Sequence, residues 1–202
     1  QDKLGTQMRA VGEVMSIGKN YKEALQKAIR SLEIGRAGLG FAKNFNQCSL
    51  DELMSMLSET TSERQFIIYE ALRKGATVEA LYRKTYIKSW FIQQMKELVE
   101  LEEEILRYKG KALPDALLTK AKQDGFADRY LAKLLAIPEE QIRLRRTAIG
   151  TVEGWDAVPV SGVKKAAYYY STYNSPDRTS TSNRRKIMIL GGGPNRIGQG
   201  IE

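Results

Sequence analysis

The 202-residue sequence contains no histidine and only one cysteine, Cys48. The absence of histidine excludes Ser-His-Asp triads, Cys-His pairs and most zinc sites within the chain. A single cysteine excludes an internal disulfide, which fits a reducing compartment, so we expect a cytoplasmic protein. No apolar run approaches the roughly 20 residues that span a bilayer, and we expect no membrane partner.

The composition is that of a globular chain, with 42% hydrophobic and 28% charged residues. The formal net charge is +8. Such a surplus of positive charge can indicate nucleic acid or another anionic partner. A part of a larger protein, however, need not have balanced positive and negative charges by itself. Because the basic residues are spread along the chain, we favour the second interpretation.

Helix signals recur between residues 20 and 149. A stripe of apolar residues at spacings of three or four predicts the longest helix, from Ile87 to about Tyr108. The other predicted helices begin at the following capping residues: Asn20 with Glu23, Ser49 with Glu52, Ser62 with Gln65, Thr77, Pro114 and Pro138.

Four acidic residues crowd the end of the long helix: Glu100, Glu102, Glu103 and Glu104. They could suggest a metal site. Consecutive residues on a helix point in different directions, so we interpret them as a solvated face. We therefore predict no metal site and no catalytic residue in the chain.

The composition changes at Gly150. Val158–Val163 and Ala166–Tyr173 favour strands, and Asn174–Asn183 has the composition of a linker. The run Tyr168-Tyr169-Tyr170 could be a stacking platform for bases. Packing within a strand is the preferred interpretation.

The end of the sequence predicts a different architecture. Lys186–Leu190 reads as a buried strand, and three glycines follow it, as at the start of a nucleotide-type α/β domain. No second strand follows, so we expect a truncated first strand. The overall fold class is then mainly α, with a helical connection domain, a short extended connector and this truncated α/β start.

The glycine loop matches neither common phosphate motif. No Gly-Lys-Ser/Thr follows, and Arg196 stands where the dinucleotide fingerprint needs its third glycine. A structural turn is the simplest interpretation, and ligand contact is a weak hypothesis. Its candidate residues are Gly191, Gly192, Gly193, Asn195, Arg196, Gly198 and Gln199.

An alternative function is carried by Phe126 to Arg146, which resembles a helix-turn-helix. Arg143, Arg145 and Arg146 would lie on its recognition helix. The turn position, however, holds Ala136 rather than glycine. Such helix pairs are common in plain helical domains, so nucleic acid is the less favoured partner.

Two strings resemble one family, the large chain of carbamoyl phosphate synthetase. GGGPNRIGQGIE is similar to the opening of its second synthetase half, and TQMRAVGEVMSIG (Thr6 to Gly18) to the end of its first ATP-grasp half. The resemblance implies four parts: residues 1–18 end the first half, 19–150 form a helical oligomerisation domain, 151–185 are an extended connector, and 186–202 begin the second half.

The same resemblance implies a role. The family makes carbamoyl phosphate from bicarbonate, glutamine-derived ammonia and two ATP, for arginine and pyrimidine synthesis. Its ATP and Mg or Mn ligands lie outside Thr6 to Glu202, so this chain alone is expected to be inactive and to hold no cofactor. Expected partners are the rest of the large chain, a glutaminase small subunit and a second copy bound through the helical domain. The stretch Gly154 to Tyr173 departs from the family pattern.

Overall fold

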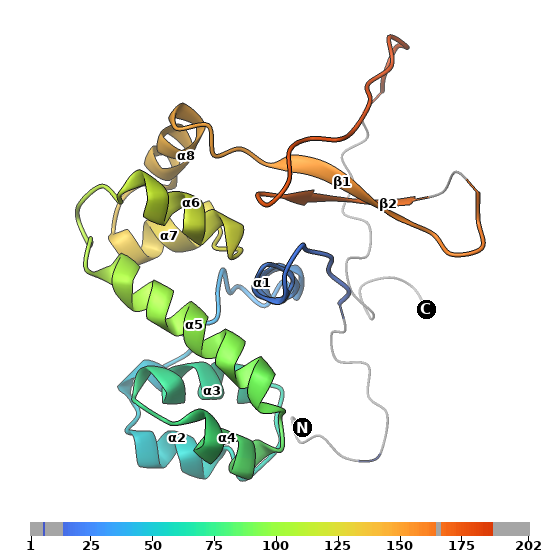
Figure 1. Cartoon of the computed structure of the whole chain (residues 1–202). Helices are drawn as coiled ribbons and strands as arrows, with labels where there is room; N and C mark the ends of the chain where they lie inside the picture. Colours follow the sequence, from blue (N-terminus) through green and yellow to red (C-terminus); the bar gives the residue numbers. More distant parts are fainter. Residues whose placement is uncertain (1–5, 7–13, 165–166, 188–202) are drawn as a thin grey trace.

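The computed structural model describes Thr6, residues 14–164 and residues 167–187 (Figure 1). In these residues the chain is mainly α-helical, as predicted, with one two-stranded antiparallel sheet. The elements are α1 (Tyr21–Ser31), the 3₁₀ helix η1 (Phe45–Gln47), α2 (Leu50–Met56), α3 (Arg64–Arg73), α4 (Val78–Thr85), α5 (Ser89–Leu106), α6 (Asp115–Gln123), α7 (Asp128–Leu135), α8 (Glu139–Ala148), β1 (Gly154–Pro159) and β2 (Ala167–Thr172).

Most helix starts follow the predicted caps. The Asn20 side chain accepts a hydrogen bond from the Glu23 amide at 2.9 Å, and Ser49 forms a complete capping box with Glu52. The prediction at Ser62 is wrong, because α3 begins at Arg64 with Glu63 as its N-cap residue and without a side-chain cap bond. The Glu63 carboxylate forms ion pairs with Arg36 and Lys43 and makes no cap bond.

The long helix α5 organises the molecule, as its apolar stripe predicts. It crosses the molecule diagonally between the group α2, α3 and α4 and the group α6, α7 and α8 (Figure 1). Ile92, Leu98 and Ile105 are completely buried on it. The stripe is narrower than predicted at its start, because Phe91 in the first turn is partly exposed.

The connector after Gly150 is a β-hairpin rather than a merely extended segment. β1 pairs with β2 in antiparallel register, from Gly154 opposite Thr172 to Pro159 opposite Ala167. The strand predicted over Val158–Val163 is therefore wrong in its bounds: it begins four residues earlier and ends at Pro159. Cross-strand hydrogen bonds stabilise residues at its start that have little strand propensity of their own. The strand preference of the tyrosine run is confirmed.

The hairpin and the segment after it are attached to the helices. Asn174, at the start of the predicted linker, donates from its side chain to the Gln123 carbonyl at 2.8 Å and to Glu23 at 3.1 Å. Lys19 pairs with Asp156 of β1. The linker prediction is therefore wrong for its first residue. The strand predicted at Lys186–Leu190 lies mostly outside the described residues, and the fourfold division of the chain stays a prediction.

Candidate functional site

The centre of the helical body is a buried carboxylate on α5. Glu102 has no solvent exposure, and its Oε2 accepts hydrogen bonds from the hydroxyls of Tyr69 on α3 at 2.7 Å and Tyr130 on α7 at 3.0 Å. Its other oxygen pairs with Arg73. The predicted solvated face is thus wrong for Glu102. The reason is its position four residues after Leu98, which places it on the buried stripe.

The electrostatics of this Glu102 cluster keep the two tyrosines and Arg73 protonated, so that they can donate hydrogen bonds. Burial raises the pKa of Glu102, and the charge of Arg73 opposes that rise. Burial and the adjacent carboxylate raise the pKa of both tyrosines well above their ordinary value, so both hydroxyls remain donors. Burial alone would lower the pKa of Arg73, but Glu102 and Glu70 raise it. Both oxygens of the buried Glu102 carboxylate are engaged within the protein, so we interpret the cluster as structural.

The Glu102 cluster also fixes the loop of residues 35–43. Glu70, fully buried beside Arg73, accepts the amide of Phe41 at 2.7 Å. A Cβ at Gly38 would lie 2.6 Å from the Tyr130 ring, and one at Gly40 would lie 2.5 Å from the Tyr130 hydroxyl. Only glycine allows the loop to approach this closely.

A second polar cluster joins the hairpin to α6, α7 and α8. The Lys122 ammonium is almost completely buried and donates to the Phe126 carbonyl and to Asp128, each at 2.7 Å. Arg146 on α8 binds the other oxygen of Asp128 at 2.7 Å. The Tyr173 ring, just after β2, lies 4.7 Å from the Lys122 ammonium and 5.5 Å from the Arg146 guanidinium.

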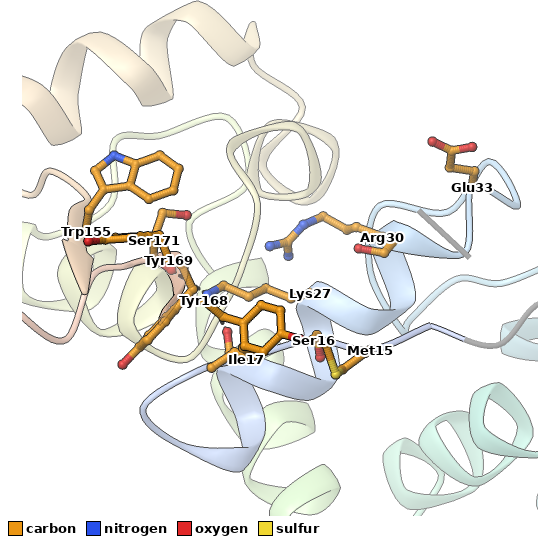
Figure 2. Close-up of a pocket in the computed structure, with 12 residues that line it drawn as sticks. Met15, Ser16, Ile17, Lys27, Arg30, Glu33, Trp155, Tyr168, Tyr169 and Ser171 are labelled. Carbon is orange, nitrogen blue, oxygen red and sulfur yellow. Dashed lines mark hydrogen bonds between the residues drawn. The ribbon is translucent and has the colours of Figure 1, made fainter. Parts of the chain in front are cut away.

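A groove of about 750 Å³ lies between α1 and the hairpin. Figure 2 shows Lys27 of α1 extending towards Tyr168 and Ser171, with Trp155 on the far side. Tyr168 and Tyr169 are exposed, as a stacking platform would require. The Lys27 ammonium, however, already donates to the carbonyls of Ile17 and Ser171. Arg30, the other cation that lines the groove, donates to the Gly125 carbonyl at 2.7 Å. The groove therefore offers aromatic surface, and the protein itself engages both of its cations.

Aromatic rings also gather on the surface where α4 meets α5. Trp90 is 56% exposed, and its ring packs edge-on against Tyr21 at 5.3 Å and Phe91 at 5.0 Å. Tyr82 and Tyr86 are exposed on the α4 side of the same junction. We call these five residues the aromatic surface. The sequence analysis missed it, although the adjacent Trp90-Phe91 pair at a helix start was a visible signal.

The arginines of the helix-turn-helix alternative are occupied within the chain. Arg145 pairs with Asp115 at 2.6 Å, Arg146 with Asp128, and Arg143 with Glu140 at 3.4 Å. Ala136 does adopt the left-handed conformation that such a turn needs, with φ of 56°. No observation on the described residues supports nucleic acid binding, because carboxylates neutralise the cations that would meet phosphates.

The glycine-loop candidates from Gly191 to Gln199 lie outside the described residues, so the hypothesis of ligand contact stays a prediction. Among residues 14–164 and 167–187, no group of three or more acidic or cysteine side chains is arranged to hold a metal ion. In the same residues no helix is both long and apolar enough to cross a bilayer.

Comparisons with known proteins agree on one family. The family description "Carbamoyl-phosphate synthetase large chain, oligomerisation domain" matches residues 13–150. The carbamoyl phosphate synthase large chain of Archaeoglobus fulgidus is 43% identical over 206 residues, which cover 98% of this chain and 19% of that protein.

Two bacterial relatives give the same result. The carbamoyl phosphate synthase large chain of Pseudothermotoga lettingae is 42% identical and covers 100% of this chain, and that of Pseudomonas aeruginosa is 39% identical and covers 99%. The chain spans about a fifth of the length of the curated relatives it matches. It belongs to the carbamoyl phosphate synthase large-chain family and contains that family's oligomerisation domain.

Proposed function

We propose that this chain connects the two ATP-using halves of a larger carbamoyl phosphate synthase chain and binds a second copy of itself through the aromatic surface. The observation that carries the proposal is a set of five aromatic rings, four of them exposed and Tyr21 partly buried, on a well-packed helical body. Large rings with few rotatable bonds bury much area at little entropic cost, and they are enriched at protein interfaces.

The surroundings of Trp90 suit a protein partner. A groove of about 570 Å³ lies beside it, between the end of α3 and the start of α5, and Leu72 and Val78 are among its apolar lining residues. A partner side chain could enter this groove while Trp90 packs on the partner. We choose a second copy as the occupant because the matching family description is an oligomerisation domain.

Truncation of Trp90 tests this interface. In Trp90→Ala, the dissociation constant of the self-associated species is expected to rise about 30-fold, equivalent to about 2 kcal/mol at an interface hot spot. The thermal midpoint should change little, because more than half of the side chain is exposed. Sedimentation equilibrium over a wide concentration range measures the change.

The matched control is Trp155→Ala, which removes the other tryptophan, 45% exposed on the hairpin. It should leave self-association within about twofold of the unmodified chain. The opposite pattern, with Trp155 critical and Trp90 neutral, would move the interface to the groove between α1 and the hairpin. A chain that is monomeric at every concentration would show that the helical body does not associate by itself.

The activity belongs, in this proposal, to the whole large chain. That chain would make carbamoyl phosphate from bicarbonate, glutamine-derived ammonia and two ATP with Mg or Mn, in arginine and pyrimidine synthesis. Its further partner would be a glutaminase small subunit, and its location the cytoplasm. The membership of the family supports these points.

We expect the 202-residue chain alone to hydrolyse no ATP. Its two buried polar clusters are closed within the protein, and we assign no catalytic residue to it. Phosphate release in the presence of ATP and Mg should equal the buffer background. Turnover that disappears when Gly192 is replaced by valine would contradict this expectation and would assign the glycine loop a direct role.

A further inference from the structure

A small basic cavity lies on the side of the helical body formed by the loop of residues 35–43 and α7. Its volume is about 360 Å³, within the range of small-molecule sites. Four cationic side chains line it, and no carboxylate does: Arg36 and Lys43 from the loop, Arg129 and Lys133 from α7. The Tyr130 ring also lines the cavity, and Gly38 approaches this ring closely.

The two cations on α7 have no partner among the residues that the structure describes. Arg129 and Lys133 lie one helical turn apart, and within the described residues neither side chain forms an ion pair or a hydrogen bond. Like charges at this spacing destabilise a helix unless an anion lies between them. On the loop side, the single carboxylate of Glu63 pairs with both Arg36 at 2.8 Å and Lys43 at 3.0 Å. The cavity thus keeps a local excess of positive charge.

The backbone of the loop supplies a second and independent observation. Gly38 and Gly40 are buried residues that line the cavity, and within the described part of the chain neither backbone amide forms a hydrogen bond. Buried amides are almost always paired in folded proteins, with protein, water or a ligand. The amide of Phe41, the next residue in the loop, is paired in the usual way, because it donates to the Glu70 carboxylate.

We propose that this cavity binds a phosphate-class oxyanion, either free or as the phosphate group of a small metabolite. Glycine amides without acceptors and unpaired cations are the groups that proteins use to hold phosphate oxygens. The site would bind the anion between α7 and a loop that the Glu102 cluster holds rigid. A bound anion would also remove the repulsion between Arg129 and Lys133. The proposal is independent of self-association.

Titration of the 202-residue chain in a chloride buffer at constant ionic strength tests the site. Inorganic phosphate and glycerol 3-phosphate are the two probes, and isothermal calorimetry is the measurement. Saturable binding of either probe is the expected result. Tighter binding of the ester would assign the site to a phosphorylated metabolite, and equal or tighter binding of phosphate to the free anion. No saturable binding of either probe would overturn the proposal.

The paired variant R129Q/K133Q removes two of the four charges. It should weaken binding about tenfold or more through the loss of charge-assisted contacts. The control R83Q/K84Q removes two exposed cations from α4, outside the cavity lining, and should stay within about twofold. Equal weakening in both variants would show a non-specific charge effect and overturn the site.

Amide chemical shifts provide a measurement that needs no variant. Phosphate added to the unmodified, isotope-labelled chain should shift the amide resonances of Gly38 and Gly40 most, with saturation at the calorimetric affinity. The amide of Gly75, a glycine at the end of α3, serves as the internal reference. If the Gly38 and Gly40 resonances do not move more than that of Gly75, the loop does not bind the anion.

Discussion

Replacing Glu102 by alanine is expected to lower the free energy of unfolding by about 3–5 kcal/mol, the cost of breaking a buried ion pair from one side. The variant leaves Arg73 buried with less opposing charge and removes the acceptor of the Tyr69 and Tyr130 hydroxyls. Urea unfolding followed by far-ultraviolet circular dichroism measures the change. Because three elements meet at this carboxylate, we expect the whole helical body to be affected.

The matched control is Glu104→Ala, a glutamate of the same helix that is exposed. It should change the free energy of unfolding by no more than about 0.5 kcal/mol. Glu102→Gln separates charge from shape, since it keeps the side-chain volume but not the anion. If Glu102→Ala and Glu104→Ala were equally mild, the cluster would not be a source of stability.

The pH dependence of the Glu102 contribution has a defined sign. Burial raises the folded-state pKa of this carboxyl above its ordinary value of 4.5. The native state therefore keeps the proton over a range in which the unfolded state has lost it. The contribution of Glu102 to stability falls as the pH rises from 4.5 through the folded pKa, and it is constant above that.

The helices could be predicted because their signals are local. Asn20, Ser49 and Thr77 cap the helices that they were predicted to cap, since a side-chain oxygen within three residues of an amide needs no distant partner. The Ser62 prediction was wrong for the opposite reason. There a distant residue, Arg36, engages Glu63, and a local pattern carries no information about it.

The Glu102 cluster could have been found in part. Its position four residues after Leu98 and three before Ile105 lies on the apolar stripe, so burial followed from helical periodicity. Its partners did not, because Tyr69 and Tyr130 are about 30 residues away on either side and only the packing of three helices brings them together. Four acidic residues within five positions, Glu100 and Glu102 to Glu104, concealed one buried residue among exposed ones.

The hairpin shows the same limit. The strand preference of Tyr168 to Tyr170 was visible, but Gly154 and Asp156 have low strand propensity and belong to β1 because Thr172 and Tyr170 pair with them. The docking of the hairpin on the helices depends on long-range contacts of Lys19, Lys27 and Asn174. Local sequence signals therefore predicted which segments form helices or strands. The long-range polar contacts determine how the hairpin packs on the helices, and local signals do not contain them.

Asp128 at the second polar cluster is expected to be nearly as sensitive as Glu102. Asp128→Asn removes the anion that Lys122 and Arg146 share, and Lys122 is too deeply buried to regain water. The expected loss in the free energy of unfolding is about 3 kcal/mol. Trp155 fluorescence can follow the hairpin separately if Trp90 is first replaced by phenylalanine, because the chain has two tryptophans.

The neighbouring arginine offers a matched control. Arg145 pairs with Asp115 at 2.6 Å, but both side chains are about half exposed. Asp115→Asn should therefore cost no more than about 1 kcal/mol, as is usual for surface ion pairs. Asp115→Asn and Asp128→Asn each remove the carboxylate that pairs with one of two adjacent arginines of α8. The difference between their losses of stability therefore reports the effect of burial. Equal losses would show that burial of Lys122 adds nothing to the second cluster.

The pH profile of the Asp128 variant gives a second test with a sign opposite to that of Glu102. Burial alone would raise the pKa of Asp128, but Lys122 and Arg146 outweigh it and hold the pKa below 3.8. The stabilisation is thus complete above 3.8 and is lost as the pH falls through the folded pKa. The stability difference between the unmodified chain and Asp128→Asn should be constant at neutral pH and shrink in acid below 3.8. If this stability difference instead grew in acid, the pKa of Asp128 would be higher in the folded state than in the unfolded state. That result would contradict the contacts with Lys122 and Arg146.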